Sequence, residues 1–286
     1  MAEGDVTSEP GAACLALLRE TDRDRYLACL LSPVDRQGAL AGLYAFSAEL
    51  ARVRDLVREP LPGEIRLQYW RDLLSGAAHG ETSGNPLAVA LLDSVSTYRL
   101  PVEALLAMID ARVGDLYDDP IGPRAALEGY AGETASALIQ LASLILDADQ
   151  ARESSDCAGH AGVAQSIAGL LLLLPQHRAR GQLYIPDEIL TATGLDRDSF
   201  LAGEDRIRLA AALEAFAGLG LDHLQKARLA WKGQNVLLPA YLPVALAGPV
   251  LSKARRHPLA FLDGQAQRPQ WRRQLTLFKA SLTKKF

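Results

Sequence analysis

The sequence predicts an all-α protein built as one helical domain. Hydrophobic residues make up 49% of the 286 residues, and aromatic residues only 6%. Alanine and leucine dominate the apolar residues and favour helices, whereas β-branched and aromatic residues favour strands. Apolar residues recur at helical spacing between breaks that contain proline or glycine. No run alternates with period two for long enough to predict a strand.

The expected helices follow from this spacing and its punctuation. Residues 12–31 alternate apolar and charged groups at helical spacing and end at Ser32-Pro33, because a residue that precedes proline avoids the helical conformation. Residues 36–59 form a long helix that stops at Pro60. Residues 159–174 are apolar on all sides, which in a soluble chain predicts a central buried helix. Further helices are expected at residues 64–78, 86 onward, 102–117, 125–147 and 206–226, with two or three more in the C-terminal part.

We therefore expect about nine to eleven helices in a single domain over residues 13–286, preceded by a flexible N-terminus at residues 1–12. The acidic N-terminus lacks the basic and apolar regions of a secretory signal. The longest uninterrupted apolar run, residues 167–174, is much shorter than the about 20 residues of a membrane span. These features predict a cytoplasmic protein.

Charge is unevenly distributed along the chain. Residues 251–286 contain nine Lys/Arg and one acidic residue, Asp263, while the preceding part is acidic. Within this tail, an apolar stripe recurs at spacings of three and four residues; it consists of Trp271, Leu275, Phe278, Leu282 and Phe286. Two interpretations remain open: residues 268–286 bind an anionic membrane surface, or they form a terminal helix packed on the domain. The acidic body and the absence of a nucleic-acid-reading motif exclude nucleic acid as a partner.

Several short motifs occur in the order typical of one enzyme family. They are Ser32-Pro33 with Arg36, Leu43-Tyr44-Ala45-Phe46, Arg66 with Trp70, Asp115-Leu116, Tyr130-Ala131-Gly132, and Arg180-Gly181-Gln182-Leu183-Tyr184-Ile185-Pro186. Together they resemble the squalene and phytoene synthases, and the last motif is similar to that family's R-G-R-x-Y-L-P segment. The resemblance implies an isoprenoid-synthase-type bundle around a central apolar cleft. Its candidate lining residues are Tyr44, Phe46, Glu49, Tyr130, Arg180 and Tyr184.

The resemblance also locates two aspartate-rich motifs that bind magnesium and diphosphate in the enzymes. The first, Asp-Asp-x-x-Asp, falls on Ala51, Arg52 and Asp55. The second, Asp-x-x-Glu-Asp, falls on a segment whose key positions read Leu173, Gln176 and His177. Magnesium needs hard oxygen ligands to neutralise a diphosphate leaving group. We therefore expect no catalytic residue, no bound metal and no other cofactor.

This degenerate pattern resembles one branch of the family, the complex I assembly factors related to phytoene synthases. That branch carries A-F-N-x-E-[IL]-A-x-V-[KR]-D and Pro-x-His; residues 45–55 follow the first with Ser47 in place of Asn, and Pro175-Gln176-His177 follows the second. The resemblance implies a non-catalytic assembly or interaction factor whose partner is a subunit or assembly intermediate of respiratory complex I. It would work as a peripheral protein at the inner face of the inner membrane.

Two other functions remain open. A prenyltransferase with a reworked site would still act on allylic diphosphates. A carrier would bind an apolar isoprenoid or lipid without turnover. The apolar residues 171–174 keep this function open, because they preserve an apolar cleft. For Glu49 and Arg52, an exposed ion pair and a polar cavity facing His177 are equally open.

Overall fold

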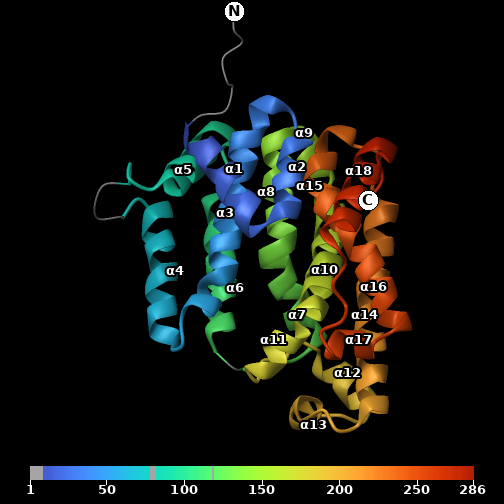
Figure 1. The fold of residues 1–286 in the computed structure, drawn as a ribbon. Helices are drawn as coiled ribbons and strands as arrows, with labels where there is room; N and C mark the ends of the chain where they lie inside the picture. The colour runs from blue at the N-terminus through green and yellow to red at the C-terminus, as the bar shows by residue number, and fades with distance from the viewer. Residues whose placement is uncertain (1–8, 78–81, 118) are drawn as a thin grey trace, which may run out of the picture.

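The computed structural model describes residues 9–77, 82–117 and 119–286. Every regular element in these ranges is a helix, which confirms the predicted all-α class. The longer helices lie side by side in a bundle (Figure 1). Ten of these helices have ten residues or more: α1 (Glu9–Thr21), α3 (Val34–Leu56), α4 (Pro60–Leu74), α5 (Pro86–Tyr98), α6 (Val102–Val113), α8 (Ala137–Leu146), α10 (Ser155–Leu172), α14 (Arg206–Ala230), α16 (Ala247–Arg256) and α18 (Gln270–Thr283).

Shorter helices connect these ten. They are α2 (Arg23–Leu30), α7 (Arg124–Ala131), α9 (Ala148–Glu153), α11 (Leu174–Ala179), α12 (Asp187–Ala192), α13 (Arg197–Ala202), α15 (Leu238–Tyr241) and α17 (Leu259–Leu262). The connections also contain 3₁₀ turns, namely η1 (Gly114–Leu116), η3 (Asn235–Leu237) and η4 (Leu242–Leu246), and a π-helical turn, η2 (Gly132–Ser136).

Two of the expected helices are interrupted. The helix predicted over residues 12–31 breaks at Asp22, where the backbone leaves the helical conformation. The Asp22 side chain caps α2 by accepting a hydrogen bond of 3.0 Å from the Arg25 amide. The helix predicted over residues 125–147 contains the π-helical turn η2. The flexible tail predicted at residues 1–12 lies outside the described residues as far as residue 8, and residues 9–12 form the first turn of α1.

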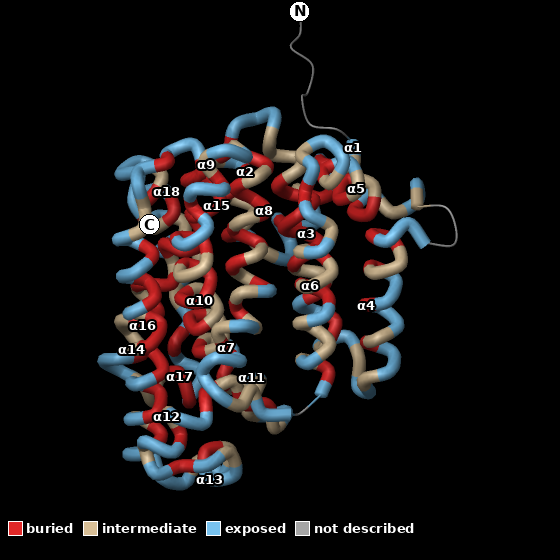
Figure 2. The backbone as a smooth tube through the Cα atoms, turned by 180° about the vertical axis from the view of Figure 1, so that it is seen from behind, coloured by how far each residue is buried: buried red, intermediate tan, exposed pale blue. Residues whose placement is uncertain are grey.

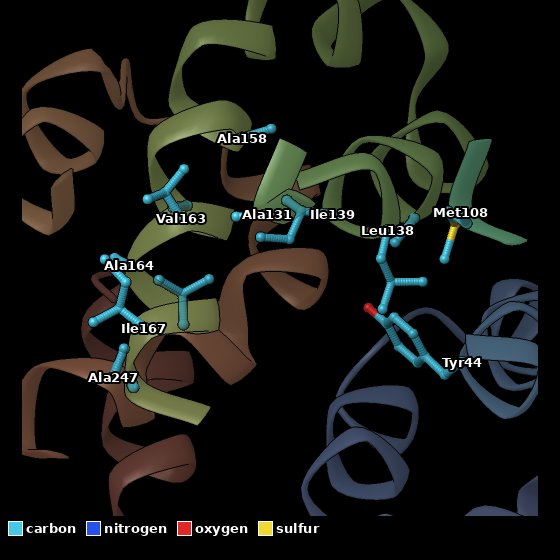
Figure 3. Close-up of a cluster of buried hydrophobic side chains, with 14 of the residues drawn as sticks. Tyr44, Met108, Ala131, Leu138, Ile139, Ala158, Val163, Ala164, Ile167 and Ala247 are labelled. Atoms are coloured by element: carbon cyan, nitrogen blue, oxygen red, sulfur yellow. The ribbon is translucent and has the colours of Figure 1, made fainter. Parts of the chain in front are cut away.

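The core runs through the centre of the bundle. Helix α10 carries nine buried residues and packs against α14, as the central position predicted for residues 159–174 requires. Figure 2 shows buried backbone along α10, α14 and α8, with exposed segments at the periphery. One cluster of buried apolar side chains extends from Cys14 to Phe286. In Figure 3, Leu138 and Ile139 of α8 lie between Tyr44 of α3 and the apolar residues of α10.

A search for uninterrupted apolar runs does not identify the segment that has the length and hydropathy of a membrane span. Among the described helices, Asn235–Arg256 has the length and mean hydropathy (1.5) that could suffice to cross a membrane. Prolines 239, 243 and 249 interrupt this segment, so a search for unbroken runs misses it. In the fold, 67% of its apolar window is buried inside the molecule. Core packing is therefore sufficient to explain its hydropathy.

A close approach between α10 and η2 generates a stability prediction. A Cβ atom on Gly162 would overlap the backbone and hydroxyl of Ser136, which donates a hydrogen bond of 2.8 Å to the Gly159 carbonyl. We expect Gly162→Ala to lower the free energy of unfolding by about 2 kcal/mol or more, since overpacking against backbone cannot relax cheaply. Gly169→Ala in the same helix meets nothing within 4 Å and should raise it by about 0.5 kcal/mol. Urea denaturation measures the free energy of unfolding of both variants. An equal change in the two variants would contradict the close approach between Gly162 and Ser136.

Candidate functional site

The positions of the first expected metal motif lie on the last turns of α3. Ala51, Arg52 and Asp55 are all exposed. Asp55 forms an ion pair with Arg180, with 2.7 Å between its Oδ1 atom and Nη1 of the guanidinium. The one carboxylate at these three positions is therefore already neutralised by a cation from the R-G-Q-L-Y-I-P segment.

The positions of the second expected motif lie at the junction of α10 and α11. Pro175, in the first turn of α11, lacks the amide that would continue the hydrogen bonding of α10. Leu173, at this junction, is 46% exposed, and Gln176 is also exposed. His177 turns inward, and its ring centroid lies 4.8 Å from that of Tyr184. Of these three positions, His177 alone therefore lies beside Tyr184 and the polar cluster to which Tyr184 belongs.

That cluster is centred on the carboxylate of Asp115. Arg112 donates a hydrogen bond of 2.9 Å to Asp115 Oδ2, and the Tyr130 hydroxyl donates one of 3.0 Å to the same atom. The Tyr184 hydroxyl donates to Asp115 Oδ1 at 2.7 Å. Arg112 also donates to the Tyr130 oxygen at 2.7 Å. Both carboxylate oxygens thus accept hydrogen bonds within the protein. Three parts of the fold meet at this mostly buried carboxylate: α6 with η1, α7, and the segment after α11.

Gln182 contributes a contact that the sequence analysis did not assign. Its side chain is 3% exposed, and its Nε2 atom donates a hydrogen bond of 2.8 Å to the main-chain oxygen of Asp115. The Ile121 amide donates to the Leu183 carbonyl at 3.4 Å. A polar residue between apolar neighbours in the R-G-Q-L-Y-I-P motif is the signal that could have identified a buried amide.

A pocket of about 160 Å³ lies beside this cluster. Its polar lining comes from Asp115, Tyr117, Asp119, Tyr130, Gln182 and Tyr184. This volume is smaller than the about 300–1,000 Å³ of typical small-molecule sites. The pocket therefore has room for several waters but not for a long isoprenoid chain.

The remaining candidate cleft residues fill the core instead of lining an open cleft. Tyr44 and Phe46 are buried, and the Phe46 ring packs edge-on against Trp70 with 5.2 Å between centroids. Where α10 and α11 meet the R-G-Q-L-Y-I-P segment, the cavity beside His177 measures about 10 Å³. That is about the room one water needs.

Glu49 is partly buried and Arg52 is exposed. Within the described part of the chain these two side chains form no ion pair with each other. The exposed Glu49–Arg52 pair that one interpretation expected is therefore absent. On the same part of α3, Asp55 forms an ion pair with Arg180.

Burial and charge set the protonation of the cluster. Burial lowers the pKa of His177, and the nearby Asp115 carboxylate opposes this only in part. Burial alone would lower the pKa of Arg112, but Tyr130 and Asp115 reverse the effect and raise it. Burial raises the pKa of both Tyr130 and Tyr184. At neutral pH the arginine is therefore charged and both tyrosine hydroxyls remain protonated, as their hydrogen bonds to Asp115 require.

A second polar chain links α10, α14 and α7. The Nδ1 atoms of His160 and His223 lie 3.0 Å apart, and His223 Nε2 lies 3.2 Å from Glu128 Oε1. Burial lowers the pKa of His223, while Glu128 acts in the opposite direction. Sequence spacing gives no sign of this contact, because 63 residues separate the two histidines along the chain. Within the described ranges, no group of three or more His, Cys, Asp or Glu side chains is arranged to hold a metal ion.

The two ion pairs of this region should differ in their contribution to stability. The side chains of Arg112 and Asp115 are 21% and 14% exposed, so Asp115→Asn leaves a mostly buried guanidinium without its counter-charge. We expect this variant to lose about 3–5 kcal/mol of unfolding free energy. Asp55→Asn removes a pair whose carboxylate is 56% exposed and should cost less than about 1 kcal/mol. Chemical denaturation of both variants measures the difference, and equal losses would show that the Asp115 cluster does not stabilise the fold.

Comparison with known proteins places this geometry in a family. The sequence profile described as squalene/phytoene synthase matches residues 18–274. The chain is 30% identical over 257 residues to "NADH dehydrogenase (ubiquinone) complex I, assembly factor 6" of Homo sapiens, covering 88% of this chain and 77% of that protein. It is 28% identical over 274 residues to the Mus musculus protein of the same name, covering 96% and 82%.

A solved structure shows the shared fold directly. A crystal structure of a dehydrosqualene synthase in complex with ligand superimposes with a TM-score of 0.75 at 16% identity, covering 96% of each chain. This identity is too low to transfer an activity, but the fold is the same over nearly the whole length. Together with the profile match, it shows that the chain belongs to the squalene/phytoene synthase family.

Proposed function

We propose that this protein is a non-catalytic member of the family that acts as an assembly or interaction factor for respiratory complex I. The observation that carries the proposal is the similarity, over 88% and 96% of the chain, to two relatives named as assembly factors of that complex. The partner is a complex I subunit or assembly intermediate. The protein would work at the inner face of the inner membrane, in contact with an anionic membrane surface through residues 268–286.

The chemistry of the expected metal positions supports a role without catalysis. Arg52 places a cation, and Ala51 no ligand, where the enzymes of the family would hold magnesium. Asp55 is engaged by Arg180, and the carboxylate of Asp115 already accepts hydrogen bonds on both oxygens. A diphosphate leaving group would need several carboxylates to hold its magnesium ions. We propose that the protein uses neither magnesium nor another cofactor.

The two other functions find less support. A prenyltransferase would need a second source of metal ligands, which these positions do not offer. A carrier of isoprenoids or lipids would need an open apolar cleft. The cavity among Leu171, Leu174 and Phe216 measures about 10 Å³, which is one water in size and not the size of a lipid chain.

Affinity purification from the native cell tests the proposed partner. The tag belongs at the N-terminus, because Phe286 at the other end is 7% exposed and packs into the core. We expect subunits of NADH dehydrogenase to be enriched over an equally tagged, unrelated helical protein when mild cross-linking and mass spectrometry are used.

A second measurement separates an assembly factor from a protein that binds the finished complex. Cells that lack this chain should accumulate partly assembled NADH dehydrogenase on native gels. Normal assembly in those cells, together with no enrichment of any complex I subunit, would contradict the proposed function.

A further inference from the structure

Helix α18 displays apolar side chains that the fold does not bury. Trp271, Leu275, Phe278 and Leu282 are 59%, 62%, 50% and 80% exposed, and we call these four residues the α18 stripe. Their spacing of four, three and four residues places them on one face of a helix with 3.6 residues per turn. Contiguous exposed apolar surface of this kind marks an interaction site more often than isolated apolar residues do.

The opposite side of the helix is fixed to the domain. Leu277 and Ala280 are its buried residues, and Arg273 forms an ion pair with Asp24 of α2. The sequence analysis placed Phe286 in the same stripe, but the chain turns after α18 and the Phe286 ring lies 5.2 Å from Trp231 and 5.1 Å from Tyr241. The stripe therefore belongs to a helix that is already anchored on its other face.

Positive charge borders the stripe on one flank and at its C-terminal end, without acidic neighbours on the same element. Residues 264–286 contain no Asp or Glu. Arg272 and Lys279 lie on one flank of the stripe, Lys284 and Lys285 follow the helix, and these four form no ion pair with the part of the chain that the structure describes. The Arg272 guanidinium lies 5.0 Å from the Trp271 ring centroid. An exposed aromatic and aliphatic face flanked by unpaired cations fits an anionic lipid surface.

Charge also favours an anionic lipid surface over a second copy of this chain as the partner that the stripe binds. A symmetric dimer through the stripe would bring the cations of both copies together without acidic partners, which costs free energy. Helix α4 provides an internal contrast. Its exposed residues Leu61 and Ile65 (66% and 63% exposed) have neighbours of both signs, because Glu59 and Glu64 accompany Arg58 and Arg66. The apolar face of α4 therefore lacks the purely cationic border of the α18 stripe.

We propose that the α18 stripe and its four cations bind the surface of a bilayer that contains anionic lipids, with α18 lying in the plane of the interface. This inference deepens the proposed function and rests on it only for the membrane at which the protein works. The apolar side chains insert between headgroups, and the cations contact lipid phosphates. Figure 1 places α18 on the opposite side of the bundle from α4, so α4 and its neighbours remain free to meet a partner.

Vesicle co-sedimentation with the full chain tests the inference. The parent protein should bind vesicles of mixed phosphatidylglycerol and phosphatidylcholine, bind pure phosphatidylcholine weakly, and lose binding as salt is raised. Arg272→Gln with Lys279→Gln should weaken binding about 30-fold, which is the loss expected for two interfacial cations. Trp271→Ala with Phe278→Ala should weaken it by about tenfold or more, with a component that salt does not screen.

Leu61→Ala with Ile65→Ala is the matched control, because it removes two equally exposed apolar side chains from α4. This control should bind like the parent. All variants should melt close to the parent temperature, since the altered side chains are exposed. Two results of the vesicle experiment would overturn the inference: no preference of the parent for anionic vesicles, or an equal loss of binding in the control. It would also be overturned if the parent bound no vesicles and light scattering showed a dimer that the stripe variant loses.

Enrichment of complex I subunits is measured separately. The membrane-binding inference and the proposed role in complex I assembly can therefore fail independently.

Discussion

The candidate site depends on the hydrogen bonds that the carboxylate of Asp115 accepts. It accepts hydrogen bonds from Arg112 of α6, Tyr130 of α7 and Tyr184 of the segment after α11. A mostly buried ion pair is stable only if its other hydrogen-bonding groups also find partners, and here both oxygens of the carboxylate accept hydrogen bonds. The cluster fixes Tyr184, whose ring packs on His177, and the same segment places Arg180 against Asp55. The region that would receive a diphosphate is thus occupied by groups that satisfy one another.

The family fold and the metal-dependent chemistry of the family's enzymes depend on different residues of the sequence. The fold depends on apolar residues spread over all the long helices, so it tolerates changes at a few surface positions such as Ala51 and Arg52. Metal-dependent chemistry depends on several carboxylates that converge on one point, and each substitution there removes a ligand outright. A fold therefore persists when its original activity does not, and function must be argued from the site.

Much of the architecture could be predicted from sequence, because apolar residues at helical spacing indicate long helices and prolines indicate where they begin and end. This holds for α3, α4 and α14, and the motif segments located Tyr130, Tyr184 and Arg180. Tertiary contacts decided the rest. The break at Asp22 depends on a local cap that competes with helix continuation, and the π-helical turn at residues 132–136 lies where Gly162 of α10 approaches closely. Gln182 and the His160–His223 contact join residues far apart in sequence. Whether the apolar tail was core or surface was undecidable from spacing alone; the structure buries Phe286 and exposes the α18 stripe.

We expect the region around Asp55, Arg180 and His177 not to bind magnesium diphosphate, and a melting experiment with the ligands present tests this expectation. A ligand that binds only the folded state at about 100 times its dissociation constant stabilises it by about 2.7 kcal/mol, which is readily visible as a rise in melting temperature. We expect the same melting temperature with and without farnesyl diphosphate and Mg²⁺, added alone and together. A rise in melting temperature that requires both would contradict this expectation, because it would show that these residues still assemble a metal–diphosphate site.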